Sequence, residues 1–327
     1  MQLGTNGSAD AHYYGAMGRT IVCVFLGLSF ACEGTADPVD AAIDVDAGTD
    51  AGVPCVPPAD EPFACEELTP DPGCDAHWVV GVTGRIVTSA GEPVDNGRAQ
   101  LCVRIAPDDA LVCLLPPRTD VNGEFSIVVP EELRCVNRAV MRAIAPTRPL
   151  ATTYCPIAFT VGNEPIVDLG DPYVLYPVVA ATVPPIGDEI AQRDVVFADG
   201  LTLTLAPIDL PSATEYEGLS GAPVAVSSTA CFSRGSTFDG AYVFNPEAEV
   251  EAGAAVSIPN EAALAAGTII DLYVLGGLET RLIDGSLVEE GELARFGPAT
   301  VSTDGVRIVS DADTRLPYLS WLVWSVR

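Results

Sequence analysis

A turn followed by a strand is encoded by residues 119–130, TDVNGEFSIVVP. Asp and Asn favour turns because their side chains bond to nearby backbone groups, and Gly123 tolerates backbone conformations that other residues avoid. After the turn, Phe125, Ile127 and Val129 occupy every second position. Such alternation is typical of a β-strand with one buried face. The stretch therefore predicts one strand of a half-buried sheet.

Similar patterns occur on both sides of this strand. Short runs bounded by Gly, Pro, Asp and Asn place apolar residues at alternate positions, and each run predicts a strand. The runs are Trp78, Val80, Val82 and Ile86; Leu101, Val103 and Ile105; and Ile157, Phe159 and Val161. Several short strands at this spacing favour an all-β fold of the sandwich type.

The order of these segments resembles a known family. Residues 82–87 (VTGRIV), 91–94 (GEPV), 99–103 (AQLCV) and 119–126 (TDVNGEFS) follow one another, and residues 167–177 are similar to a closing strand. Together they resemble a carboxypeptidase regulatory-like domain, a small transthyretin-like β-sandwich. The resemblance implies that residues 77–177 form such a sandwich. The Arg-rich segment 131–148 departs from the family pattern, which indicates an insertion or a helix. The spacing of Arg134, Arg138 and Arg142 fits a helix or a strand, so periodicity does not decide between them.

Residues 178–327 predict a second β-sandwich-like domain. Residues 201–205 (LTLTL) alternate cleanly, and residues 268–275 (TIIDLYVL) have the composition of a buried strand. Asp304-Gly305 is a strong hairpin signal because both residues accept the backbone angles of a tight turn. The segment 316–324 (LPYLSWLVW) predicts a further strand.

The N-terminal region predicts export from the cytoplasm. Arg19 precedes an apolar run at residues 21–31, which is typical of a signal peptide and about half the length needed to span a bilayer. Residues 1–31 are therefore assigned to a signal region, in which Met17 is a plausible true start. The segment 28–32 (LSFAC) resembles a bacterial lipobox. The resemblance implies a lipoprotein whose Cys32 carries lipid, and Glu33 after it favours the outer membrane.

An ordinary signal peptide, cut near Ala31, is the alternative; it would release a soluble protein. In either case residues 32–76 predict a tether, because they are acidic, rich in Pro, Ala and Gly, and poor in apolar residues. The tether ends in a Cys-rich stretch. We expect most of it to be disordered.

The charge balance excludes some partners. The chain carries a formal net charge of −29, and all 16 of its basic residues are Arg. Such a surface repels phosphate backbones, so nucleic acid is not an expected partner. The cluster of Arg134, Arg138, Arg142 and Arg148 is expected to pair with the abundant acids, and an anion site is the alternative.

Cysteine usage indicates an oxidising compartment. Ten Cys are present, with Cys23 in the signal region and Cys32 at the lipobox, and the even number that remains predicts disulfides. Cys102 and Cys113 lie symmetrically about the turn residues Pro107-Asp108, so a hairpin would place them face to face. Cys135 with Cys155 is a second candidate pair. The connectivity of Cys55, Cys65, Cys74 and Cys231 cannot be derived from the sequence.

No catalytic, metal or cofactor site is predicted. No C-x-x-C spacing occurs, and His77 is the only histidine after the signal region. The acidic runs 247–249 and 289–290 are expected to be solvated. We therefore expect a non-enzymatic envelope lipoprotein with structural or adhesive β-modules. The alternatives are a carbohydrate-binding module, with Tyr318, Trp321 and Trp324 as candidate glycan-stacking residues, and an assembly partner of a larger surface complex. The expected partners are the membrane, cell-wall or extracellular polysaccharide, and surface proteins.

Overall fold

The computed structural model describes residues 55–58, 60–159 and 165–327, all within one compact unit that spans Pro54–Arg327. The predicted signal region, the lipobox Cys32 and most of the predicted tether lie outside the described residues. Strands dominate this part of the chain, which confirms the all-β class. The helical elements are short: η1 (Glu131–Leu133), η2 (Pro207–Asp209), α1 (Ala213–Glu217), η3 (Val226–Thr229) and α2 (Ala230–Ser233).

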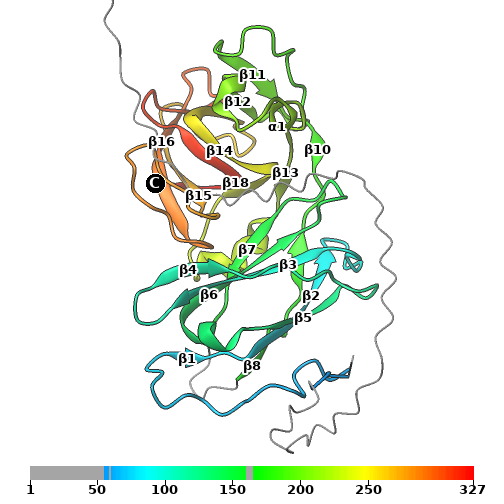
Figure 1. Ribbon diagram of the computed structural model, residues 1–327. Helices are drawn as coiled ribbons and strands as arrows, with labels where there is room; N and C mark the ends of the chain where they lie inside the picture. Colours follow the sequence, from blue (N-terminus) through cyan, green and yellow to red (C-terminus); the bar gives the residue numbers. More distant parts are fainter. Residues whose placement is uncertain (1–54, 59, 160–164) are drawn as a thin grey trace, which may run out of the picture. The chain divides into compact units, whose positions relative to one another are not determined.

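Two small sheets are formed by residues 77–175 (Figure 1). The first has the order β1-β6-β3-β4, with β7 also pairing with β6. Its strands are β1 (His77–Trp78), β3 (Arg98–Ile105), β4 (Ala110–Cys113), β6 (Cys135–Ile144) and β7 (Thr153–Pro156). In the second, β2 pairs with β5 in antiparallel fashion and with β8 and β9 in parallel fashion. Its strands are β2 (Gly81–Thr88), β5 (Glu124–Val128), β8 (Ile166–Asp168) and β9 (Tyr173–Leu175).

The alternating residues of the sequence meet in one cluster between these two sheets. Val82 and Ile86 of β2, Leu101 and Val103 of β3, and Phe125 of β5 are all buried in it. The turn before β5 forms as predicted: Asp120 Oδ1 accepts hydrogen bonds from the backbone N–H groups of Asn122 and Glu124. Gly123 has a φ of +79°, and a Cβ there would overlap the carbonyl oxygen of Ile86, so the turn requires glycine.

The Arg-rich segment contains the strand β6, so the strand spacing of its arginines holds and the suggested insertion or helix is wrong. β6 is central in its sheet, between β3 on one side and β1 and β7 on the other. Val136, Ala139, Val140, Met141 and Ala143 are all buried, so both faces of β6 are covered. A strand covered on both faces loses the period-two pattern that identifies half-buried strands. The strand expected around Ile157 lies earlier, as β7, and Val161 is outside the described residues.

The C-terminal half forms one nine-stranded sheet that closes on itself. β14 pairs with both β17 and β18, β15 pairs with both β16 and β18, and β16 pairs with β17, so five strands form a ring. This closed sheet differs from the expected sandwich. The ring strands are β14 (Gly240–Pro259), β15 (Ile269–Leu275), β16 (Leu293–Val301), β17 (Arg307–Ser310) and β18 (Leu316–Val326). The others are β10 (Val179–Ala180), β11 (Arg193–Val196), β12 (Thr202–Leu205) and β13 (Ser220–Val224).

Five of these strands match the sequence patterns, counting the two that flank the Asp304-Gly305 turn. β12 and β15 lie within the segments expected to be strands, and β18 contains the closing segment. The Asp304-Gly305 hairpin joins β16 to β17, and Asp304 Oδ1 accepts from the backbone N–H of Val306. β14, the longest strand, was not predicted. Its register shifts against β18 between Val243 and Ala248 and again between Glu249 and Ala254, so extra residues interrupt its pattern.

Three hydrophobic clusters fill the described part of the chain. One lies between the two small sheets, and a second is built from residues of the C-terminal half, including Leu203, Tyr242 and Leu322. A third takes residues from both halves, among them Tyr154 and Trp321. The first two clusters divide near the predicted boundary at residues 177–178, and the third crosses it. The two-domain division itself therefore stays a prediction.

Four disulfides are present among the described residues, and they give the connectivity of the eight cysteines there. Cys102 and Cys113 are direct partners in the β3–β4 ladder and are bonded, which confirms that prediction. The other pairs are Cys55–Cys65, Cys74–Cys135 and Cys155–Cys231. The prediction of Cys135 with Cys155 is wrong. Cys155 lies opposite Met141 on β6, six residues along the strand from Cys135, which corresponds to about 20 Å.

Candidate functional site

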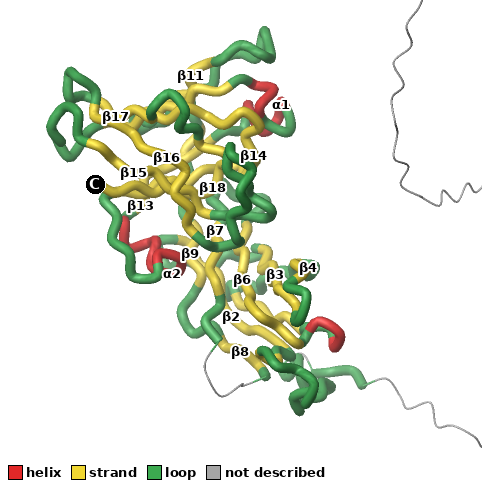
Figure 2. Tube along the Cα trace, turned by 90° about the vertical axis from the view of Figure 1, so that its left-hand side faces the viewer, coloured by secondary structure: helices red, strands yellow, loops and turns green. Residues whose placement is uncertain are grey.

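The contact between the two halves combines a buried apolar cluster with buried ion pairs. We call it the joint, and define it by the third cluster around Trp321 together with the ion pairs beside it. Figure 2 shows α2 close to β7 and β9, and α2 carries one end of the Cys155–Cys231 disulfide. That disulfide covalently links β7 to the C-terminal half. Because disulfides persist only under oxidising conditions, the four bonds place the chain in an oxidising, extracytoplasmic environment.

Trp321 forms the apolar centre of the joint. It is fully buried, and its ring meets Tyr176 and Phe232 edge to face at centroid distances of 5.4 and 5.0 Å. Its indole Nε1 donates a hydrogen bond of 3.0 Å to the carbonyl oxygen of Thr152. The prediction that Trp321 stacks on a glycan is wrong, because neither face of its ring is accessible.

Glu247 is the polar centre of the joint. It lies in the first register shift of β14, where extra residues bend the strand and re-aim its side chains. Its side chain is only 4% exposed. Arg142 donates to Glu247 Oε2 through Nε at 3.1 Å and Nη2 at 2.7 Å. The hydroxyls of Tyr154 and Tyr318 both donate to Glu247 Oε1. We call these four residues the Glu247 network.

The network changes the chemistry of its tyrosines. Burial and, after it, the negative charge of Glu247 raise the pKa of Tyr154 and of Tyr318 above the ordinary tyrosine value. Both hydroxyls therefore stay protonated and act as hydrogen-bond donors even at an alkaline pH at which an exposed tyrosine ionises. The prediction that Tyr318 stacks on a glycan is wrong, because the side chain is buried and its hydroxyl is committed to Glu247.

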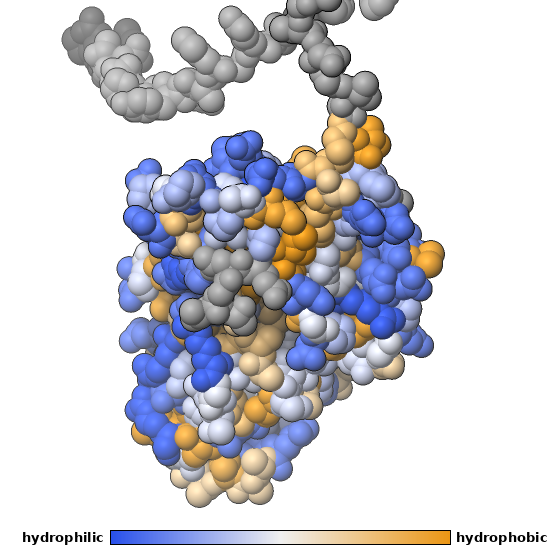
Figure 3. Space-filling model, turned by 90° about the horizontal axis from the view of Figure 1, so that it is seen from below, coloured by the Kyte–Doolittle hydropathy of each residue, from blue (hydrophilic) through white to orange (hydrophobic). Residues whose placement is uncertain are grey.

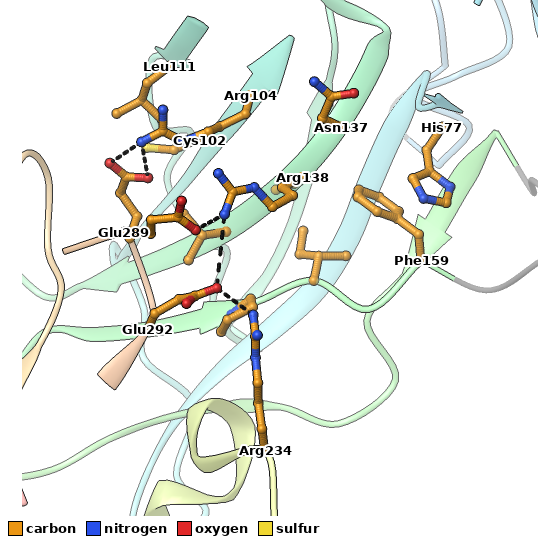
Figure 4. A pocket seen from close by; sticks show the side chains of 15 residues that line it. His77, Cys102, Arg104, Leu111, Asn137, Arg138, Phe159, Arg234, Glu289 and Glu292 are labelled. Atoms are coloured by element: carbon orange, nitrogen blue, oxygen red, sulfur yellow. Dashed lines mark hydrogen bonds and ion pairs between the residues drawn. The ribbon is translucent and has the colours of Figure 1, made fainter. Parts of the chain in front are cut away.

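A second group of charges surrounds a small cavity of about 170 Å³ (Figure 4). Arg104 Nη2 donates to both carboxylate oxygens of Glu290 at 3.0 Å. Arg138 pairs with Glu289, and also with Asp109 at 3.2 Å. We call the set the arginine–glutamate cluster, and its members are Arg104, Arg138, Arg234, Glu289, Glu290 and Glu292. At the other end of the cavity, His77 stacks on Phe159 with a centroid distance of 4.5 Å.

These contacts show which charge predictions held. Arg134, Arg138 and Arg142 each pair with an acid, as expected, whereas Arg148 forms no ion pair among the described residues. The side chains of Glu247 and Glu290 were expected in solvent and are almost completely buried. The acidic runs and the Arg-rich segment can each be recognised in the sequence. Their ion pairs, Arg142 with Glu247 and Arg138 with Glu289, join residues more than 100 positions apart, and local sequence patterns do not predict such pairs.

The third aromatic candidate lies elsewhere. Trp324, near the end of β18, is half-buried and lines a cleft of about 570 Å³ at one end of the closed sheet. Tyr242 in the same cleft donates a hydrogen bond of 2.9 Å to Asp199. Trp324 is therefore the one predicted stacking residue whose side chain reaches solvent.

Seen from below the view of Figure 1, the face in Figure 3 is a mixture of hydrophilic and smaller hydrophobic areas. Within residues 55–327 as described, no helix is long and apolar enough to cross a membrane. Among the same residues, no group of three or more His, Cys, Asp or Glu is arranged to hold a metal ion.

Known proteins give no further assignment. No protein-family model matches the chain, and no curated protein shows significant similarity to it. The resemblance of residues 77–177 to the carboxypeptidase regulatory-like domain therefore stays a prediction, as does the lipobox.

Proposed function

We propose that this protein is a non-enzymatic lipoprotein of the cell surface, anchored through Cys32, whose two strand-rich halves act as one rigid module in envelope structure or adhesion. The observation that carries the proposal is the joint. One disulfide, the Glu247 network and the arginine–glutamate cluster all connect the same two halves. A joint of this kind suits a protein that transmits force or holds a fixed shape. A hinge would have few buried contacts and many exposed backbone bonds.

The disulfides support the extracytoplasmic location, and the acidic sequence before Pro54 would hold the module away from an anionic membrane. The lipid anchor itself rests on the resemblance of residues 28–32 to a lipobox. The outer-membrane position rests on Glu33 alone.

Metabolic labelling with a radioactive fatty acid tests the anchor. In a bacterial host that exports the chain, the wild type should incorporate label and sediment with membranes, whereas Cys32→Ala should do neither. Release of an unlabelled wild-type protein into the soluble fraction would instead indicate an ordinary signal peptide. Protease treatment of intact cells then reports surface exposure.

Limited proteolysis of the oxidised chain tests the rigid module. We expect early cleavage before the first disulfide and no early cleavage at residues 178–182, which join the two halves. Rapid cleavage at this site would contradict a rigid module, even if the anchor were present; the two fragments are resolved by electrophoresis after the Cys155–Cys231 disulfide has been reduced.

Carbohydrate binding is the second candidate function. It is favoured by a specific observation, the half-buried Trp324 in a cleft with carboxylates. An adhesive role requires some ligand, and a saccharide site would supply it.

A further inference from the structure

The cleft at the end of the closed sheet has the size and lining of a ligand site. Its volume of about 570 Å³ falls within the range of roughly 300–1,000 Å³ that small-molecule sites occupy. The floor is apolar and includes the buried Ile258 and Ile308. The side chain of Trp324 forms part of the wall, so we call this site the Trp324 cleft.

The position of Trp324 is fixed by a glycine on the neighbouring strand. Gly240 and Trp324 are direct partners in the β14–β18 ladder. A Cβ at Gly240 would overlap the six-membered ring of Trp324, so the indole lies directly over bare backbone. One ring face is thereby supported by β14, and the ring cannot move inward. A rigid aromatic side chain that remains partly in solvent is well suited to stacking.

The charges of the cleft are all of one sign. Asp199, Asp239 and Glu261 line it, and its lining contains no Arg. Asp239 and Glu261 are exposed, and Asp199 is partly exposed. Carboxylates only accept hydrogen bonds, so the matching ligand must present donors. They also repel a ligand that carries negative charge.

We propose that the Trp324 cleft binds an uncharged saccharide, whose C–H face stacks on Trp324 and whose hydroxyls donate to Asp199, Asp239 and Glu261. A sugar ring matches the cleft in both respects, because it has an apolar face and a rim of hydroxyl donors. Uronic acids and phosphorylated sugars are excluded by the carboxylates. The inference deepens the adhesive role and rests on the proposed surface location, where polysaccharides are accessible.

The first test is a glycan array and calorimetry with the oxidised chain. Uncharged oligosaccharides of several linkages are compared with uronate oligosaccharides and with deacetylated amino glycans. We expect saturable binding to at least one uncharged glycan, little dependence on salt, and no binding to uronates. Preference for uronates, or binding only to amino glycans that disappears at raised salt, would overturn the proposal.

Variants then locate the site. Trp324→Ala should weaken binding at least about tenfold, since an aromatic stack contributes about that much. Gly240→Ala keeps the indole but displaces it, so it should also weaken binding. The matched control is Tyr273→Ala, which removes a half-buried aromatic outside the cleft and should leave binding unchanged. Equal affinities for the wild type and Trp324→Ala would overturn the assignment.

Fluorescence of the wild type gives a second measurement of binding that does not depend on whether a variant folds. The chain has three Trp, and Trp78 and Trp321 are buried. A bound sugar should therefore change the emission of the wild type through Trp324, with the same saturation curve as the calorimetry. Absence of glycan binding would overturn this site but leave fatty-acid labelling at Cys32 unaffected, so the two proposals fail independently.

Discussion

Removing the carboxylate of Glu247 should destabilise the protein more than removing any exposed acid. In Glu247→Ala, Arg142 loses its charged partner, and the hydroxyls of Tyr154 and Tyr318 lose their acceptor. The free energy of unfolding is the quantity affected. Because all four residues belong to the joint, the loss should appear in the main unfolding transition of the described unit.

The magnitude follows from burial. Breaking a buried ion pair by removing one partner costs about 3–5 kcal/mol, and a buried donor left without an acceptor costs about 1–3 kcal/mol. Arg142 is 21% exposed and also donates to Gln100 at 3.0 Å, so part of the first cost is avoided. We therefore expect a loss of about 3–5 kcal/mol in total. For a unit of this size that corresponds to a fall in Tm of about 6–10 °C.

The assay is thermal and urea unfolding of the oxidised chain, followed by circular dichroism. Glu249→Ala is the matched control, because Glu249 lies two residues along the same strand and is exposed. It should change the free energy of unfolding by less than about 0.5 kcal/mol. Glu247→Gln should lose less than Glu247→Ala, since the amide oxygen still accepts a hydrogen bond. A loss in Glu247→Ala no larger than that of Glu249→Ala would refute the buried network.

Three further predictions concern a crosslink, a turn and alkaline pH. The double variant Cys155→Ser with Cys231→Ser should lose about 2–4 kcal/mol in the same unfolding assay, since the bond closes a loop with a separation of 76 residues; a fully retained Tm would contradict this crosslink. Gly123→Ala should cost clearly more than Gly91→Ala in urea unfolding, because both glycines have positive φ but only at Gly123 would a Cβ overlap backbone. Equal losses of unfolding free energy in the two variants would show that the positive φ, and not the overlap with backbone, sets the cost. Finally, the tyrosines of the Glu247 network have raised pKa values, so above pH about 10 the unfolded chain releases protons that the folded chain keeps. The free energy of unfolding should therefore not depend on these groups below that pH and should fall above it. The check is Tm measured from neutral to alkaline pH, and a constant Tm would contradict the prediction.

The sequence patterns located the strands that have one buried face. Phe125 and Ile127 alternate because one side of β5 faces the core and the other faces solvent. The Cys102–Cys113 disulfide could also be predicted from the sequence, because a local turn fixes which residues lie opposite each other in a hairpin. Both inferences use positions close together in the chain. They failed for β6, where a second layer covers the other face.

The candidate site was predicted less well for the same reason. Trp321 and Trp324 lie three residues apart on one strand and have the same chemical character. Residues three apart on a regular strand point to opposite faces, but this spacing does not say which face another part of the chain will cover. In the fold, Thr152 and Phe232 cover Trp321. Trp324 packs against Gly240 on one side and stays partly exposed to solvent.

The sequence by itself determined the all-β class, the oxidising environment and the acidic, Lys-free surface, because composition and local periodicity do not depend on distant contacts. The tertiary structure alone decided the closed ring of strands, three of the four disulfides and the burial of Glu247 and Glu290. Each of these joins residues far apart in the chain. Long-range pairing is fixed by how whole faces pack together, and a linear pattern of residues carries no record of that packing.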